Sequence, residues 1–125
     1  MNPSDLKYTS EHEWVRMDGD DAVVGITEFA QDQLGDIVYV ELPPVGGRVE
    51  QGKQFGVVES VKTASDLYAP VTGEVVAVNS TLQDEPQSVN DAPYGDGWMI
   101  RVRPSQPGEL DGLLSADQYT ELIGD

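Results

Sequence analysis

Lys62 is the residue whose setting in this chain best suits covalent chemistry. It is one of only three lysines, and it stands in the run Glu59-Ser60-Val61-Lys62-Thr63-Ala64-Ser65-Asp66 between two predicted strands. A turn between strands lies on the surface, and the small side chains after Lys62 leave its amine open. The sequence therefore predicts that Lys62 is an attachment point for a covalently bound group. Glu59 and Asp66 stand beside it, either to orient the ammonium or to be read by the attaching enzyme.

Composition and missing motifs exclude most other kinds of active site. The chain has no cysteine and one histidine, His12, so it lacks a thiol nucleophile, a cysteine-ligated zinc and a protein-held iron–sulfur cluster. It contains no G-x-S-x-G elbow, no G-x-G-x-x-G loop and no Walker lysine. We interpret the pairs Asp20-Asp21 and Asp84-Glu85 as solvated turns, and His12 by itself as a surface or packing residue.

The charge balance limits the class of partner. The 125 residues carry a net charge of −16, from 23 acidic and 7 basic side chains. Such a chain is poorly suited to binding nucleic acid phosphates or an anionic membrane. The acidity is explained by solubility alone, or by steering toward basic patches on partner proteins. The first seven residues do not resemble a signal peptide, and no run reaches the length of a membrane span, so we expect a soluble cytoplasmic protein. We also expect it to be a monomer.

Short apolar runs separated by glycine and proline predict a mainly β single domain over residues 1–125. We expect a hairpin turn at 18–20 and strands at 12–17, 21–25, 37–42, 55–61, 66–69, 71–78 and 98–103. A helix is predicted at 27–35, with Thr27 as N-cap and Gly35 as its glycine stop. A second helix, 115–123, has Ser115 as N-cap and an apolar face that packs back on the sheet. Residues 79–97 are predicted to be loop, and 104–108 a linker.

The two sides of the lysine turn resemble one another weakly. Each side has a strand and a turn containing glycine, and Val61 and Leu67 are expected to anchor the turn in the core. Two similar β halves joined at Lys62 would form a flattened barrel or a sandwich.

Four separated segments resemble, in the same order, the H-protein family of the glycine cleavage system. Residues 59–75, around Lys62, are similar to the family's lipoylation segment, and Ser10-Glu11-His12-Glu13-Trp14-Val15 to its N-terminal signature. The helix–strand signature is matched by residues 25–27, 30–31 and 34–38, and a late loop by residues 90–99. The resemblance thus extends over nearly the whole chain.

The resemblance implies a lipoyl/biotinyl-type flattened β-barrel sandwich of two similar β halves, with a short internal helix and a C-terminal helix. It implies a non-catalytic carrier with lipoic acid in amide linkage to Lys62. The implied partners are a pyridoxal-phosphate glycine decarboxylase (P-protein), a folate-dependent aminomethyltransferase (T-protein), dihydrolipoamide dehydrogenase (L-protein) and lipoate-attaching enzymes. The first would load the aminomethyl group of glycine, the second would remove it, and the third would reoxidise the carrier.

The family also docks its loaded arm in a cleft on the carrier's own surface. Matched by motif, Glu13 and Asp66 are the carboxylates that the resemblance assigns to the cationic aminomethyl amine, with Glu11 and His12 beside them. Glu11 stands where some family members carry a small polar residue, and Gln33 where some carry histidine. These two departures affect the contacts of the cleft, not the lysine.

Three other functions remain open. The same lysine would serve an H-like protein that hands lipoyl groups to other acceptors. It would also serve biotin attachment, although that family typically flanks its lysine with methionines where this chain has Val61 and Thr63. The last alternative is an unmodified β-sandwich interaction module.

Overall fold

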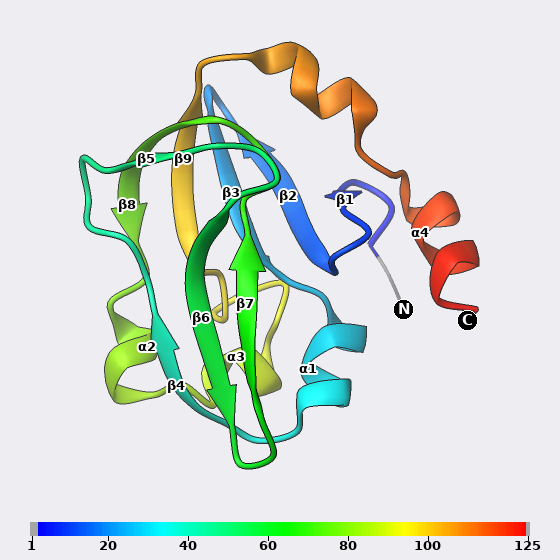
Figure 1. Cartoon of the computed structure of the whole chain (residues 1–125). Coiled ribbons are helices and arrows are strands. Elements are labelled where there is room, and N and C mark those ends of the chain that lie inside the picture. The colour runs from blue at the N-terminus through cyan, green and yellow to red at the C-terminus, as the bar shows by residue number, and fades with distance from the viewer. Residues whose placement is uncertain (1–2, 125) are drawn as a thin grey trace.

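The computed structural model describes residues 3–124, in which two antiparallel sheets face each other (Figure 1). The larger sheet consists, from edge to edge, of β1 (Lys7–Tyr8), β2 (Glu13–Asp18), β3 (Asp21–Ile26), β9 (Ile100–Pro104), β8 (Gly73–Val78) and β5 (Arg48–Val49). The smaller sheet consists of β4 (Ile37–Glu41), β6 (Gln54–Ser60) and β7 (Ala64–Tyr68). The predicted mainly β fold and flattened sandwich are confirmed, but the sheets do not close into a barrel.

The helices connect the strands or cover their ends. They are α1 (Glu28–Leu34), α2 (Thr81–Asp84), α3 (Ser88–Asp91), the 3-10 helix η1 (Pro107–Gly112) and α4 (Ala116–Ile123). In Figure 1, α1 lies beside the lower end of β7, and α4 lies outside β1 at the edge of the larger sheet.

The predicted helix ends are confirmed by their capping contacts. The Thr27 hydroxyl accepts the Ala30 amide at 3.2 Å, and Gly35 ends α1 with a φ of 82°, a value that glycine adopts without steric cost. At α4, the Ser115 hydroxyl accepts the Gln118 amide while the Gln118 side chain accepts the Ser115 amide. This reciprocal pair is a capping box, so α4 begins where the sequence predicts.

Other boundaries differ from the prediction for local reasons. The helices α2 and α3 lie in the region predicted as loop; each has four residues and no side-chain cap, so neither produces a helical period. Similarly, η1 extends beyond the predicted linker. The two-residue strands β1 and β5 are too short to show alternation. The strand after the lysine begins at Ala64 rather than at Asp66, because the turn occupies only residues 61–63.

Two apolar clusters hold the layers together. The first lies between the sheets and joins Val24 and Ile100 of the larger sheet to Val58 and Leu67 of the smaller one. The second lies beneath α4 and includes Tyr8, Trp14 and Tyr119, each fully buried. The rings of Tyr8 and Tyr119 stack at a centroid distance of 4.8 Å, so α4 packs back on the edge of the sheet as predicted.

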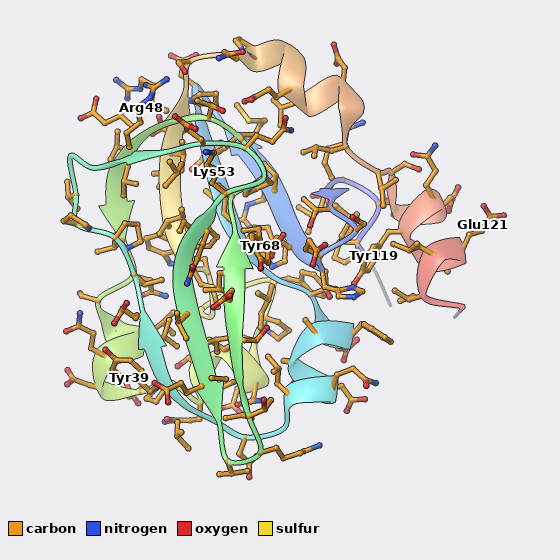
Figure 2. All side chains as sticks on the ribbon, viewed as in Figure 1. Tyr39, Arg48, Lys53, Tyr68, Tyr119 and Glu121 are labelled. Atoms are coloured by element: carbon orange, nitrogen blue, oxygen red, sulfur yellow. The ribbon has the colours of Figure 1, made fainter. Side chains whose placement is uncertain are left out.

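The Tyr119 hydroxyl joins α4 to two other segments. It lies 2.8 Å from Nδ1 of His12 and 2.8 Å from the hydroxyl of Thr27, the N-cap of α1. Tyr119 points from α4 toward the strands, whereas Tyr39 lies at the outer edge of β4 (Figure 2). Three elements distant in sequence therefore depend on one buried hydroxyl.

We predict that Tyr119→Phe lowers the free energy of unfolding by about 1–2 kcal/mol, because it leaves the buried Thr27 hydroxyl and the His12 ring without this partner. Urea denaturation followed by tryptophan fluorescence measures the change. Tyr39→Phe is the matched control: Tyr39 is 48% exposed, so this variant is expected to stay within about 0.5 kcal/mol of wild type. Equal stabilities for the two variants would contradict the assignment.

Candidate functional site

The lysine turn is a tight connection fixed by Ser60. The Ser60 hydroxyl accepts the amides of Lys62 and Thr63, each at 3.2 Å, and the Ser60 amide donates to the Thr63 carbonyl at 2.7 Å. The Val61 amide donates to the carbonyl of Asp36 at 3.0 Å, which ties the turn to the residue before β4. The backbone of the turn is therefore well held, and Lys62 is exposed at its tip.

The predicted apolar anchoring of the turn is correct on one side only. Leu67 is 2% exposed and belongs to the core, whereas Val61 is 67% exposed. The prediction for Val61 was wrong because Val61 lies within the turn, beyond the last paired residue of β6, where alternation no longer sets the direction of a side chain.

The Lys62 side chain lies against the C-terminal end of α1. Its Cε is 2.8 Å from where a Cβ of residue 35 would stand, so glycine at that position leaves room for the lysine. Its Nζ lies 3.5 Å from the carbonyl oxygen of Gln33, a long contact at the negative end of the helix dipole. The amine is thus weakly held and reachable from solvent.

The two nearby carboxylates predicted to orient the ammonium do not pair with it. Glu59 is exposed, between Tyr39 and Ala64 in the sheet register. Asp66 accepts a hydrogen bond from Gln54 at 3.1 Å. Within residues 3–124, neither carboxylate forms an ion pair with Lys62.

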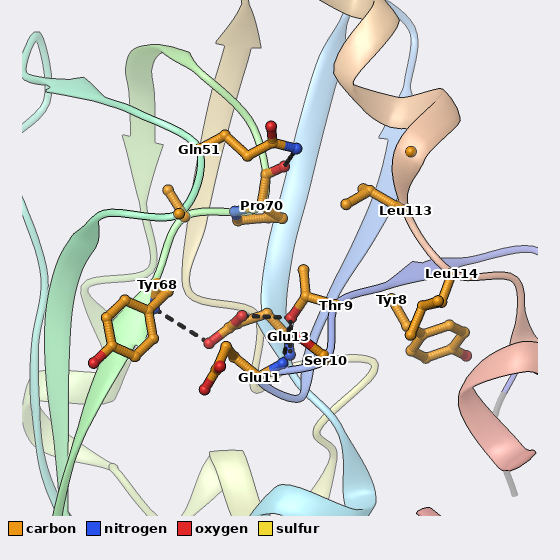
Figure 3. Close-up of a pocket in the computed structure, with 13 residues that line it drawn as sticks. Tyr8, Thr9, Ser10, Glu11, Glu13, Gln51, Tyr68, Pro70, Leu113 and Leu114 are labelled. Carbon is orange, nitrogen blue, oxygen red and sulfur yellow. Dashed lines mark hydrogen bonds between the residues drawn. The ribbon is translucent and has the colours of Figure 1, made fainter. Parts of the chain in front are cut away.

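Glu13 is a buried carboxylate at the start of β2. Its side chain is 1% exposed, one oxygen accepts the Thr9 hydroxyl at 2.6 Å, and the other accepts the Tyr68 amide at 3.2 Å (Figure 3). Burial raises its pKa to about 7, and the two hydrogen bonds counter part of that shift. Glu13 therefore changes between its charged and neutral forms near neutral pH.

Glu13 lines a pocket of about 480 Å³. Its walls come from four separate parts of the chain: Tyr8–Glu11 with Glu13, Gln51–Gly52, Tyr68–Pro70 and Gly112–Leu114. None of these described lining residues is lysine, arginine or histidine, and two, Glu11 and Glu13, are carboxylic acids. The pocket is therefore suited to a cation that can donate hydrogen bonds, with apolar walls around it.

His12 lies beside the pocket without lining it. Its ring pairs with the Tyr119 hydroxyl and contacts the Phe29 ring at a centroid distance of 5.0 Å. Burial lowers its pKa, which favours the neutral imidazole. With a φ of 72°, His12 also adopts the left-handed conformation. Its role in this structure is to hold the turn before Glu13.

The structure brings together only part of the predicted site. Glu11 and Glu13 share the pocket, and Asp66 precedes Tyr68 by two residues on β7 and so shares its face of the strand. Lys62 is six residues from Tyr68, which corresponds to about 20 Å of extended chain. Sequence reasoning missed Thr9 and the Tyr68 amide. Thr9 precedes Glu13 by four residues, but nothing in the sequence alone shows that the intervening turn folds back.

Two further features of the described residues bear on the function. Residues 3–124 contain no group of three or more His, Cys, Asp or Glu side chains that could hold a metal ion. In the same part of the chain, no helix is long and apolar enough to cross a membrane.

Comparisons with known proteins agree with one another. A family model described as "Glycine cleavage H-protein" matches residues 6–125. A glycine cleavage system H protein of Myxococcus xanthus is 57% identical over 121 residues, which is 97% of this chain and 94% of that protein. One of Symbiobacterium thermophilum is 58% identical over 117 residues, 94% and 91% of the two chains. The crystal structure of a glycine cleavage system H protein from Mycobacterium marinum superposes with a TM-score of 0.91 at 41% identity, covering 98% and 99% of the two chains.

The raised pKa of Glu13 predicts how stability depends on pH. Because its pKa is higher in the folded protein than in the unfolded chain, its contribution is fully present below about pH 4.5 and is lost as the pH rises through about 7. Glutamine does not titrate, so we expect the stability of Glu13→Gln relative to wild type to rise by about 3 kcal/mol between pH 4.5 and pH 8.

Urea denaturation at several pH values measures this difference. Glu41→Gln on β4 is the matched control, since Glu41 is exposed, and its difference from wild type is expected to stay constant over the same range. A constant difference for Glu13→Gln as well would show that Glu13 carries no such penalty in the folded protein.

Proposed function

Because the chain belongs to the glycine cleavage H-protein family, we propose that Lys62 carries a lipoyl group in amide linkage and that the protein passes the aminomethyl group of glycine between enzymes. Proteins of this family are carriers within the glycine cleavage system and are not themselves catalysts. We propose in addition that Lys62 is the residue that bears the lipoyl group and that this group serves the aminomethyl transfer steps.

The observation that carries the proposal is the presentation of the Lys62 amine. The amine stands on a turn fixed by Ser60, exposed, with one long contact to a carbonyl. Small neighbours at Thr63 and Ala64 leave room for an enzyme to surround it. These features fit an attachment site, where the backbone must be held and the amine must be free to enter another protein's active site.

In the attachment reaction, this chain supplies the nucleophile, the Lys62 amine. Nζ loses its proton to solvent and attacks the carboxyl carbon of lipoate activated as an acyl adenylate; the amide bond forms as the adenylate leaves. The positive charge of Lys62 is lost, and with it the attraction to the C-terminal end of α1. Once bound, the lipoyl group would supply a disulfide that is reduced as one of its sulfurs takes the aminomethyl group, and the dithiol left after unloading would be reoxidised by the dehydrogenase. Since the chain has no cysteine, no protein thiol competes with these sulfurs.

The pocket at Glu13 is proposed to hold the loaded end of the arm. An amine cation there would face the carboxylates of Glu11 and Glu13, and the apolar walls would shelter it from water. Asp66 lies along β7 on the way from Lys62 to the pocket. His12 holds the turn before Glu13. Glu59, beside the lysine, is proposed as a contact of the attaching enzyme.

The proposed partners follow from these steps. They are the glycine decarboxylase that loads the carrier, the aminomethyltransferase that unloads it, dihydrolipoamide dehydrogenase and a lipoate-attaching enzyme. The net charge of −16 would steer basic surfaces of such partners toward the carrier. We propose that the chain acts as a monomer, as one domain over residues 1–125, in the cytoplasm, where the absence of cysteine has no structural cost.

We predict that the intact mass of the protein, isolated from cells supplied with lipoate, is increased by one lipoyl group. Lys62→Arg is expected to abolish both the increment and glycine–bicarbonate exchange with the partner enzymes, because a guanidinium is not acylated. Lys53→Arg is the matched control, since the Lys53 side chain is 75% exposed and should retain both.

Mass spectrometry also separates the alternatives. A mass increase equal to one biotin would show that biotin, not lipoate, is the cofactor. No mass increase would favour an unmodified interaction module. Exchange that persists in Lys62→Arg would overturn the lysine assignment. If the lipoylated wild-type protein passes its lipoyl group to another acceptor protein on incubation, the alternative of a protein that hands lipoyl groups to other acceptors would be favoured.

A further inference from the structure

We propose that Thr9 is a positioning residue that aims the Glu13 carboxylate into the pocket and thereby determines how well the carrier retains a cationic amine. The inference rests on the proposed function, in which that amine is the end of the loaded arm. Thr9 has no side-chain reactivity suited to the transfer, so any effect that it has must act through Glu13.

The Thr9 hydroxyl has one possible direction for its proton. The amides of Glu11 and Glu13 both donate to this oxygen, each at 3.2 Å. A hydroxyl oxygen has two acceptor lone pairs, and these two amides occupy them. The remaining capacity of the hydroxyl is its own O–H, which points to Oε1 of Glu13 at 2.6 Å. Thr9 is therefore an obligate donor to Glu13.

The second oxygen of Glu13 also faces an obligate donor. The Tyr68 amide donates to Oε2 at 3.2 Å, and a backbone N–H has no acceptor capacity. Since both oxygens receive hydrogen bonds from groups that only donate, the arrangement matches a carboxylate better than a carboxylic acid. The free lone pairs then remain for a ligand in the pocket that carries donors, such as a primary ammonium.

The shape of Thr9 also matters. It is partly buried at the pocket wall, and its branched Cβ restricts the rotation of its hydroxyl. Valine has nearly the same shape but neither donates nor accepts, whereas serine keeps the hydroxyl. The pair of variants Thr9→Val and Thr9→Ser thus separates the hydrogen bonds from the packing.

Burial raises the pKa of Glu13, and charge repulsion from Glu11 at the pocket wall raises it further, so both act in the opposite direction to Thr9. Tyr8, Tyr68 and, from α4, Tyr119 are the other titratable side chains near it, and burial keeps Tyr8 and Tyr119 neutral by raising their pKa. Loss of the Thr9 donor would therefore leave Glu13 with less support against protonation.

The first test is carbon-13 NMR titration of the Glu13 carboxyl in the unmodified protein. We expect Thr9→Val to raise the pKa of Glu13 by about one unit, the size typical of one lost charge-assisted hydrogen bond, and Thr9→Ser to keep it near the wild-type value of about 7. The matched control is Thr81→Val, at an exposed position of α2. Equal titration curves for Thr9→Val and wild type would overturn the proposal, as would equal shifts in the valine and serine variants.

The second test uses the lipoylated protein loaded with glycine by the decarboxylase and then isolated. The rate at which it releases ammonia is measured from pH 6 to pH 9. At pH 7 the ionised fraction of Glu13 in Thr9→Val falls from about half to about a tenth, so we expect release about fivefold faster than in wild type, and a difference that disappears by about pH 9. A difference that is independent of pH would indicate a merely structural effect and overturn the proposal.

The variant Glu13→Gln separates a failure of the proposed docking at Glu13 from a failure of the proposed role of Thr9. If this variant releases ammonia at the wild-type rate, the proposed docking at Glu13 fails, whatever Thr9 does. If Glu13→Gln releases it faster while Thr9→Val does not, the docking stands and the role of Thr9 is refuted.

Discussion

The hydrogen bond from the Tyr68 amide to Glu13 is the contact on which the site depends, because it joins the two sheets of the sandwich. Tyr68 ends β7, an edge strand of the smaller sheet, and Glu13 begins β2 of the larger one. A backbone N–H on an edge strand has no partner strand, and burying it unsatisfied would cost free energy. The carboxylate satisfies it and is itself buried by doing so. The pocket lies where the two sheets meet through this contact.

The turn before Glu13 holds this buried carboxylate in place. The chain reverses between β1 and β2 through His12, whose left-handed φ is uncommon for residues other than glycine. The reversal places the Thr9 hydroxyl within reach of Glu13, and the Tyr119 hydroxyl holds the His12 ring from α4. The C-terminal helix therefore supports a carboxylate that it does not touch by hydrogen bonding. It does so by fixing the turn that carries the carboxylate.

Much of this could be predicted from the sequence where the signal is local. Thr27, Gly35 and Ser115 end or begin helices through contacts within four residues, and the short turn at Lys62 follows from small polar residues between two apolar runs. Glu13 was found only by resemblance, because nothing in its local sequence indicates that an acid at the start of a strand is buried. The backbone of Tyr68 could not be predicted, since its role exists only after strands of different sheets meet, and Thr9 could not because nothing in the sequence shows that the turn before Glu13 folds back. The partner of Lys62 was missed for a similar reason: a backbone carbonyl at the end of α1 replaces the two nearby carboxylates.

For the proposed carrier, the balance at Glu13 has a functional consequence. A carrier must hold its cargo between encounters and give it up at each one, so the binding must be neither absent nor strong. A fully exposed carboxylate would attract an amine weakly through water, and a buried one kept fully charged would hold it tightly. Burial that raises the pKa of Glu13 to about 7, with two fixed donors acting against the shift, sets the carboxylate between these limits. Since any partner that admits water or a proton to the pocket would weaken its hold on an amine, the same balance would let an approaching enzyme release a docked arm without a large rearrangement of either sheet.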